Sequence, residues 1–427
     1  MLCTGFFIHR LLFPEVYRMD STKPLPACPV RAPEWRYHPA SELLPRAERE
    51  ARSLGAVRPS DLTGLDNLNT PCWQVVRPTA LDIPGNVTML TGKGWTEETA
   101  SLGAHMEFLE RYWAERSQVP YIIAPPSELE RKKEWYVPPA VMPLPLGVPD
   151  PQDQPLAWIR GTTLQGQSIW VPAHDVLCPF VPPAGAANPP IWRSNGLASG
   201  GHLTEAVFYG LLEVIERDAM AVAELAHVGS SVDLGNLLSE RVQDLYQRLV
   251  SLGVHLEVKQ IPAIGGVNVF AAYLDDEEAG NPLRLCGGQS AHIDPLLAIE
   301  NAILEAVQTR AVMISGARED LERHDAVAAL SYEVARREAS WWFDTTEEQV
   351  PAPSAPLALP DDLAEVVYQI DETLRSQKFY PVIFIELSPP DAELKVVRVV
   401  VPTCSEISHD SKRLGRRFLE SYRDAFA

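Results

Sequence analysis

The chain has 427 residues, 46 % of them hydrophobic, with a formal net charge of −20 and a pI near 5.0. This apolar content can bury a sizeable core. The acidic balance argues against a sequence-independent nucleic-acid binder, which needs a basic surface, so an anionic substrate would require a local cationic pocket or metal ions. The six scattered cysteines form no CxxC pair, which disfavours structural zinc and a disulfide framework and favours a reducing cytoplasm.

The N-terminal segment contains apolar residues, but His9 and Arg10 interrupt them and no basic segment precedes them, so we expect no signal peptide. Met19 is an alternative start of translation. Elsewhere no apolar run reaches the roughly 20 residues that a membrane-spanning helix requires, and we expect no membrane association. Residues 1–60 read as an N-terminal segment, partly disordered, with one helix near residues 40–55.

The rest of the chain alternates between helical and apolar strand patterns. A strand is expected at residues 70–78, and residues 379–387 and 394–402 predict a β-hairpin. Two segments, 136–155 and 350–362, carry too many prolines for regular structure and predict loops. The pattern predicts a mixed α/β protein in which helices cover β-sheets, with one catalytic domain from about residue 85 onward.

The first of three unusual helices is expected to begin after Thr96 as N-cap and to run through Glu115. Its Glu-x-x-Glu-Arg motif places Glu107 and Glu110 on a face that otherwise carries small residues such as Ala100, Gly103 and Ala104. A solvated face would more naturally carry long polar side chains. Small residues therefore indicate that something approaches this face closely.

The second helix, starting near Thr204, repeats the motif with Glu213, Glu216 and Arg217, beside Gly210. Carboxylates on so apolar a helix are costly to bury unless cations accompany them, and metal ions are suitable partners. The preceding loop, residues 194–202, is rich in Gly and Ser. Such a loop can bring backbone N–H groups against a ligand at the helix N-terminus.

The third helix is delimited by Asp294 as N-cap and Gly316 beyond its end, and carries a polar stripe of Asn301, Glu305 and Gln308. Any one of these helices is explained well enough by a solvated or salt-bridged face. Three together favour a site in which four carboxylates bind Mg²⁺, a cation that prefers oxygen ligands and substrate phosphates. Three basic residues would balance the remaining phosphate charge: Lys93, Arg217 and Arg310.

Other sites are less well supported. Residues 84–94 resemble a phosphate loop, but six residues separate Gly85 from Gly92 and no Ser or Thr follows Lys93. No GxGxxG follows a strand, and no GxSxG supports a nucleophilic serine. The histidines near the acidic helices read as packing or loop residues rather than metal ligands: His105, His202 and His292.

Residues 91–115, 194–219 and 298–320, in this order, resemble the three ATP-binding blocks of the YcaO family. With residues 63–78 upstream and 396–402 near the end, the similarity spans about residues 60–405. The resemblance implies a YcaO-like fold over residues 61–427, with a core of about 85–405, around an ATP site without a P-loop. In this family ATP phosphorylates a peptide backbone amide oxygen, which a nucleophile then replaces, giving an azoline, a thioamide or an amidine.

Carried over by position, the resemblance implies four Mg²⁺ ligands: Glu107, Glu110, Glu213 and Glu216. It implies phosphate contacts from Lys93 and Arg217, and a nucleotide pocket completed by Glu205, Glu305, Gln308 and Arg310. It assigns no catalytic residue. The implied cofactors are ATP and Mg²⁺, and the implied partners are a peptide or protein substrate and a TfuA-like or leader-binding protein. A homodimer is left open.

The chain departs from the family pattern at three positions, where many members have Ser at Gly103, Asn at Gly201 and Arg at Asn301. The loss of these polar groups motivates an alternative, a catalytically silent peptide-binding or scaffold protein with the same fold. A Mg²⁺-dependent phosphohydrolase is a further alternative. The upstream block and the C-terminal ending, which lacks prolines, resemble standalone members associated with TfuA-type partners, which favours thioamide formation.

Overall fold

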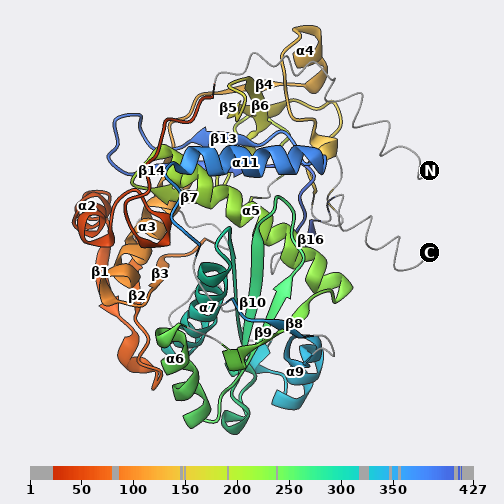
Figure 1. Ribbon diagram of the computed structural model, residues 1–427. Coiled ribbons are helices and arrows are strands. Elements are labelled where there is room, and N and C mark those ends of the chain that lie inside the picture. Colours follow the sequence, from red (N-terminus) through yellow and green to blue (C-terminus); the bar gives the residue numbers. More distant parts are fainter. Residues whose placement is uncertain are drawn as a thin grey trace.

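The computed structural model describes residues 23–78, 86–144, 148, 151–189, 192–236, 239–316, 327–345, 349–353, 357–407, 412–413 and 415. Its strands form four sheets, three of which build the scaffold (Figure 1). The small antiparallel sheet has the order β1 (Val57–Asp61), β2 (Cys72–Val76), β3 (Met89–Lys93). β2 confirms the strand expected at residues 70–78.

The five-stranded sheet has the order β11 (Cys286–His292), β10 (Asn268–Asp275), β9 (His255–Ile261), β8 (Ser230–Asp233), β12 (Gln349–Pro351). The six-stranded sheet has the order β4 (Tyr121–Ala124), β5 (Leu156–Thr163), β13 (Ile383–Glu386), β14 (Lys395–Val400), β7 (Leu197–Gly200), with β6 (Ser168–Pro172) also paired to β5. The predicted hairpin is confirmed, because β13 pairs with β14 in antiparallel register from Ile383 opposite Val400. β15 (Glu406–Ile407) pairs with β16 (Lys412–Arg413).

Helices pack on these sheets, so the expected mixed α/β architecture is confirmed (Figure 1). Their bounds are α2 (Ala40–Ser53), α3 (Glu97–Arg116), α4 (Pro126–Arg131), α5 (Leu203–Ala226), α6 (Glu240–Ser251), α7 (Pro295–Ser315), α9 (Tyr332–Glu338), α10 (Ser340–Phe343) and α11 (Leu363–Ser376). α2 is the helix expected near residues 40–55. No helix among the described residues is both long and apolar enough to cross a membrane.

The helix ends follow their capping residues. Thr96 accepts a hydrogen bond from the Thr99 backbone N–H at the start of α3, and Asp294 does the same for Leu296 at the start of α7. α7 ends at Gly316, which has a φ of 60°. The second helix, α5, begins one residue earlier than expected because the His202 side chain acts as its N-cap.

Among the described residues, a strand followed directly by a helix of 20 residues or more occurs three times, as β3–α3, β7–α5 and β11–α7. In two of these units a glycine brings strand and helix together. A Cβ added at Gly92 of β3 would lie 2.1 Å from the Ala100 carbonyl oxygen of α3, and one at Gly288 of β11 would lie 2.1 Å from the Ala306 nitrogen of α7. The small residues of α3 thus admit a strand backbone, and this contact fixes the helix beside β3.

The Pro-rich segments differ in part from the loops expected. Residues 136–155 contain a single 3₁₀ turn, Pro139–Val141, among the residues described there. Residues 350–362 begin within β12, where Val350 pairs with Val232. The N-terminal part of the chain packs firmly where it is described: Leu25, Cys28 and Trp35 belong to the same buried apolar cluster as α5. Residues 1–22 lie outside the described part.

Gly92→Ala should destabilise the fold, because the new methyl group would meet the α3 backbone at 2.1–2.2 Å and force helix and strand apart. Overpacking of this kind costs about 1–3 kcal/mol or more, measured as a loss in the free energy of unfolding by urea denaturation. Gly64→Ala is the matched control, since a Cβ there meets nothing within 4 Å. Equal losses in the two variants would contradict the close strand–helix contact.

Candidate functional site

The first wall of the candidate site is formed by α3 with β3 and β7. Glu107 accepts a hydrogen bond of 2.8 Å from the Thr91 backbone N–H of β3. Glu110, one turn further along α3, accepts one of 2.6 Å from the Ser199 hydroxyl of β7. The two acids of the first Glu-x-x-Glu-Arg motif are thus held toward the strands that begin the first and second units.

The second wall is formed by α5 and α7. Glu216 of α5 accepts a hydrogen bond of 3.1 Å from the Ala291 backbone N–H of β11. Lys93 at the end of β3 forms an ion pair of 2.5 Å with Glu305 of α7. Gln308 of α7 donates to the Thr91 hydroxyl at 3.0 Å. These contacts link all three strand–helix units through side chains singled out in the sequence.

Electrostatics show that the acids of α3 and α5 lie within reach of one another. The pKa of Glu110 is raised to about 8, chiefly by burial and also by the charges of Glu107 and Glu213, although the Ser199 hydrogen bond and the charge of Arg111 oppose the shift. Glu213 belongs to α5, so a charge of the second Glu-x-x-Glu-Arg motif affects the ionisation of an acid in the first. The pKa of Glu213 is also raised, chiefly by burial, although Arg217 opposes the shift.

Glu216 of α5 interacts electrostatically with the third strand–helix unit, β11–α7, through Glu305. Burial raises its pKa to about 7, with Arg217 lowering it and Glu305 and Glu213 raising it, while Lys93 lowers it. Arg217 contacts both acids of its motif, at 3.6 Å from Glu213 and 3.8 Å from Glu216. The cations present therefore offset only part of the cost of placing these carboxylates in the interior.

This arrangement fits Mg²⁺ held jointly with phosphate. Among the described residues, no group of three His, Cys, Asp or Glu side chains is already gathered as a metal-binding set. Carboxylates repel one another without a cation, and Mg²⁺ usually takes one or two carboxylates and completes its shell with water and substrate phosphates. Incompletely balanced acids, half-buried or buried, on the two helices that both pack on β7 provide that kind of donor set.

Comparison with known proteins places the chain in a family. A family model described as YcaO cyclodehydratase, ATP- and Mg²⁺-binding, matches residues 91–405. The chain belongs to the YcaO family. This confirms the resemblance drawn from the three sequence blocks, and the family description confirms ATP and Mg²⁺ as the cofactors. It also supports an ATP-dependent, cyclodehydratase-like modifying enzyme.

The chain is also similar, over most of its length, to two uncharacterized proteins. An uncharacterized protein of Methanothermobacter thermautotrophicus is 33 % identical over 392 residues, which cover 89 % of this chain and 98 % of that protein. An uncharacterized protein in the tfuA 3′ region of Rhizobium leguminosarum bv. trifolii is 27 % identical, over 88 % of this chain and 90 % of that protein.

Solved structures confirm the YcaO-like fold. The structure of YcaO from Methanopyrus kandleri bound with AMPPCP and Mg²⁺ matches with a TM-score of 0.72 and 24 % identity, over 91 % of this chain and 98 % of that one. A heterocyclase in complex with substrate and cofactor matches with a TM-score of 0.74 and 20 % identity, over 91 % of this chain and 55 % of that one.

Two residues assigned to the nucleotide pocket have partners of their own in this YcaO chain. Arg310 is bound by two carboxylates, Asp66 at 3.0 Å and Asp276 at 2.6 Å. Glu205 accepts hydrogen bonds from the Gly201 backbone N–H and from Arg36, both at 3.1 Å. Their contact with nucleotide stays a prediction. Among residues that were not singled out, Ser199 lies in the Gly- and Ser-rich segment 194–202. This segment was expected to be a loop, but its residues Leu197–Gly200 form β7, and its composition was the available signal.

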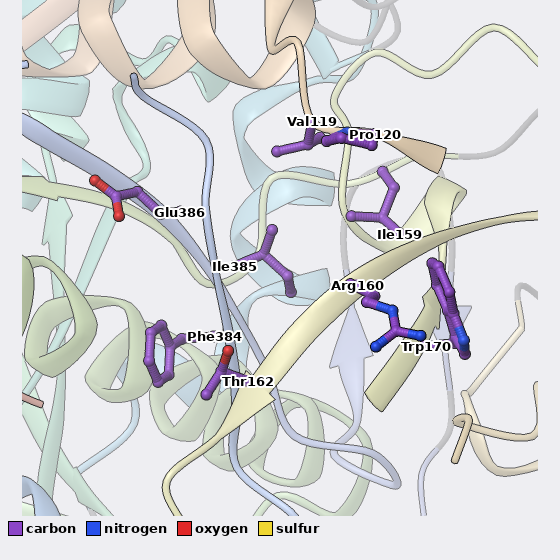
Figure 2. Close-up of a pocket in the computed structure, with 9 residues that line it drawn as sticks. All are labelled: Val119, Pro120, Ile159, Arg160, Thr162, Trp170, Phe384, Ile385 and Glu386. Carbon is purple, nitrogen blue, oxygen red and sulfur yellow. The ribbon is translucent and has the colours of Figure 1, made fainter. Parts of the chain in front are cut away.

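A separate groove lies beside β5 and β13, and none of the acids of α3 and α5 lines it (Figure 2). Its volume is about 450 Å³. Its cation, Arg160, stacks on the Trp170 ring at 4.4 Å and pairs with Glu134 at 3.1 Å. The groove is lined largely by apolar side chains and contains none of the residues assigned to Mg²⁺ or ATP. A triphosphate bound together with Mg²⁺ is better matched by the carboxylates of α3 and α5, which can hold the metal, and by Lys93 and Arg217.

Mg²⁺-dependent nucleotide binding should weaken as the pH falls from about 9 to about 6. The raised pKa values of Glu110 (about 8) and Glu216 (about 7) mean that both acids take up protons in this range, and each proton must leave before the oxygen coordinates a metal. Affinity should fall by up to about tenfold per pH unit for each proton released. Calorimetry in buffers of different ionisation enthalpy would count those protons.

Ser199→Ala provides the comparison for this pH profile. It removes a hydrogen bond that lowers the pKa of Glu110, so the loss of affinity should begin at a higher pH.

Without metal, the same raised pKa values predict that stability decreases as the pH rises from about 4.5 to about 8, because the folded state retains protons that the unfolded state has lost. An affinity independent of pH would contradict this account of the acids.

Proposed function

We propose that the chain uses ATP and Mg²⁺ to activate a backbone amide of a peptide or protein by O-phosphorylation, so that a nucleophile can replace the amide oxygen. The observation that carries the proposal is the set of incompletely balanced carboxylates on α3 and α5, of which Glu216 is buried and the other three are half-buried, flanked by Lys93 and Arg217. The family assignment supports the ATP- and Mg²⁺-dependent part.

The proposed reaction has two steps. The amide oxygen attacks the γ-phosphorus of ATP, the bond to the β-phosphate oxygen breaks, and ADP leaves. A nucleophile then attacks the amide carbon, loses a proton, and expels phosphate with cleavage of the carbon–oxygen bond. Phosphoryl transfer depends mainly on positioning and charge neutralisation, so this site needs no strong protein nucleophile.

Each side chain has a defined task in this proposal. Four carboxylates would hold Mg²⁺: Glu107, Glu110, Glu213 and Glu216. Bound Mg²⁺ would neutralise charge on the phosphate oxygens. Lys93 and Arg217 would orient the phosphates, with Lys93 exchanging its ion pair with Glu305 for phosphate oxygens. Gln308 fixes the Thr91 hydroxyl and so steadies β3 beside Glu107.

Thioamide formation is the favoured product class. One support is the similar protein in the tfuA 3′ region, which agrees with the resemblance to standalone members associated with TfuA-type partners. We therefore propose a peptide or protein substrate, a TfuA-like partner and an external sulfur nucleophile. An azoline made by a Cys, Ser or Thr side chain is the second product class, and the similarity to a heterocyclase supports it.

The alternative of a silent scaffold rested on missing polar groups, and one of these has a packing reason here. A Cβ at Gly103 would lie 3.3 Å from the Gly92 Cα and 3.7 Å from the Lys93 nitrogen. A serine would therefore press on β3 just where it presents Lys93. Gly103 is matched to the close approach of β3, so its lack of a hydroxyl group does not by itself indicate lost activity.

Glu216→Gln should abolish or strongly weaken Mg²⁺-dependent ATP binding, because it removes a buried charge from the proposed metal site. Loss of one such ligand should lower the affinity by about ten- to a hundredfold, measured by calorimetry. Glu365→Gln is the control, since Glu365 is exposed and pairs with Lys23. Unchanged affinity in Glu216→Gln would overturn the site assignment.

The reaction itself would be identified by mass spectrometry of candidate peptides co-expressed with the chain and a TfuA-like protein. Exchange of oxygen for sulfur supports the thioamide proposal, and loss of water supports an azoline. ATP turnover without any peptide modification, across the partner combinations, would favour the phosphohydrolase alternative. Peptide binding with no ATP turnover would favour a scaffold.

A further inference from the structure

A tight turn near the N-terminus lies outside the segment that the family model matches. The backbone N–H groups of Arg31 and Ala32 donate to the carbonyl oxygen of Arg36, at 3.0 and 3.1 Å. Within the turn, Glu34 has a φ of 61° and Trp35 a φ of 58°. Two consecutive non-glycine residues in the left-handed region are costly, so other contacts must hold this turn in place.

Those contacts come from the second and third strand–helix units. Trp35, only 3 % exposed, packs its ring against Phe208 of α5 at 6.2 Å and against His292 of β11 at 4.9 Å. The hydroxyl group of Tyr209 on α5 donates to the carbonyl oxygen of Glu34. The turn is therefore anchored where α5 and β11 meet, which is also where Glu216 bonds Ala291.

The turn delivers one cation to the start of α5. Arg36 lies over the Tyr209 ring at 4.8 Å and donates to Glu205 at 3.1 Å. The other carboxylate oxygen of Glu205 accepts a hydrogen bond from the Gly201 backbone N–H, and the Glu205 side chain is fully buried. A buried carboxylate is strongly destabilising without such a partner, so Arg36 and Glu205 act together.

The space beside Gly201 is filled by the same part of the chain. A Cβ at Gly201 would lie 2.9 Å from Leu43 Cδ2 and 3.3 Å from His38 Cδ2. Many family members carry Asn at this position according to the resemblance described above. Here α2 and the residues before it occupy the room that such a side chain would need, and the polar contact to the turn comes from Glu205, which Arg36 holds.

We propose that Arg36 is a positioning residue of the nucleotide site, which acts through Glu205 to fix the β7–α5 turn at Gly201. This rests on the proposed place of Glu205 in the nucleotide pocket. Arg36 balances a negative charge that would otherwise repel phosphate, and it holds Glu205 in the orientation that secures the Gly201 N–H. The nucleotide site thus includes a residue from outside the region 91–405.

The test is a double-mutant cycle read by binding of a non-hydrolysable ATP analogue with Mg²⁺ to the full chain. Arg36→Met should weaken binding by about tenfold or more, and Arg36→Lys should restore part of it. In a Glu205→Gln background, Arg36→Met should have little further effect, because its partner no longer carries charge. Arg31→Met is the matched control: it removes a cation stacked on Tyr37 in the same turn.

Thermal unfolding of each variant separates stability from binding. If Arg36→Met does not fold, Arg36→Lys decides: it keeps a positive charge beside Glu205 without the guanidinium geometry, so it should fold and bind the analogue more weakly than the parent chain, and normal binding by Arg36→Lys would then overturn the proposal. The proposal is overturned if folded Arg36→Met binds the analogue normally, or if Arg31→Met loses as much affinity as Arg36→Met. It is also overturned if Arg36→Met lowers the affinity by the same factor in the parent chain and in Glu205→Gln. Failure of the parent chain to bind the analogue would instead count against the proposed function.

Discussion

The structure depends on keeping several carboxylates inside the protein between α3 and α5. Removal of a charged group from water is expensive, and three of these acids, Glu107, Glu110 and Glu216, accept a hydrogen bond from another element. Ser199 of β7 bonds Glu110, and Ala291 of β11 bonds Glu216. Because the pKa values of both acids stay well above the usual range for glutamate, these contacts compensate incompletely, and a cation is needed to complete the balance.

Such a site requires its walls to be placed accurately, and glycine contacts do this. At Gly92 and Gly288 a strand lies so close to its helix that no side chain fits between them. Gly210 of α5 similarly allows Val399 of β14 to approach, since a Cβ there would lie 2.8 Å from Val399 Cγ2. Steric contact between backbones is stiff, so the helices that carry the acids cannot drift apart when like charges repel.

The sequence was informative where the determinants are local. Capping residues and Gly316 placed α3 and α7 within a residue of their observed ends, and helical spacing placed the paired acids on common faces. It could not show that the small face of α3 receives β3, because that contact depends on Gly92 from another element. Nor could it show that Arg310 is held by Asp66, 244 residues away. Arg36 gave no local signal at all, since its partner Glu205 is 169 residues distant.

The pairing of the basic residues suggests how ligands bind to this site. Lys93 forms an ion pair with Glu305, and Arg217 forms ion pairs with Glu213 and Glu216. Both cations therefore already have carboxylate partners before phosphate binds. If a triphosphate binds Lys93, Glu305 loses its ion-pair partner. The site, which is already rich in acids, then contains one more carboxylate without a compensating cation. ATP alone would therefore be repelled, and Mg²⁺ alone would find carboxylates that are partly protonated at neutral pH. Together, each ligand removes the charge that opposes the other, so their binding should be strongly cooperative.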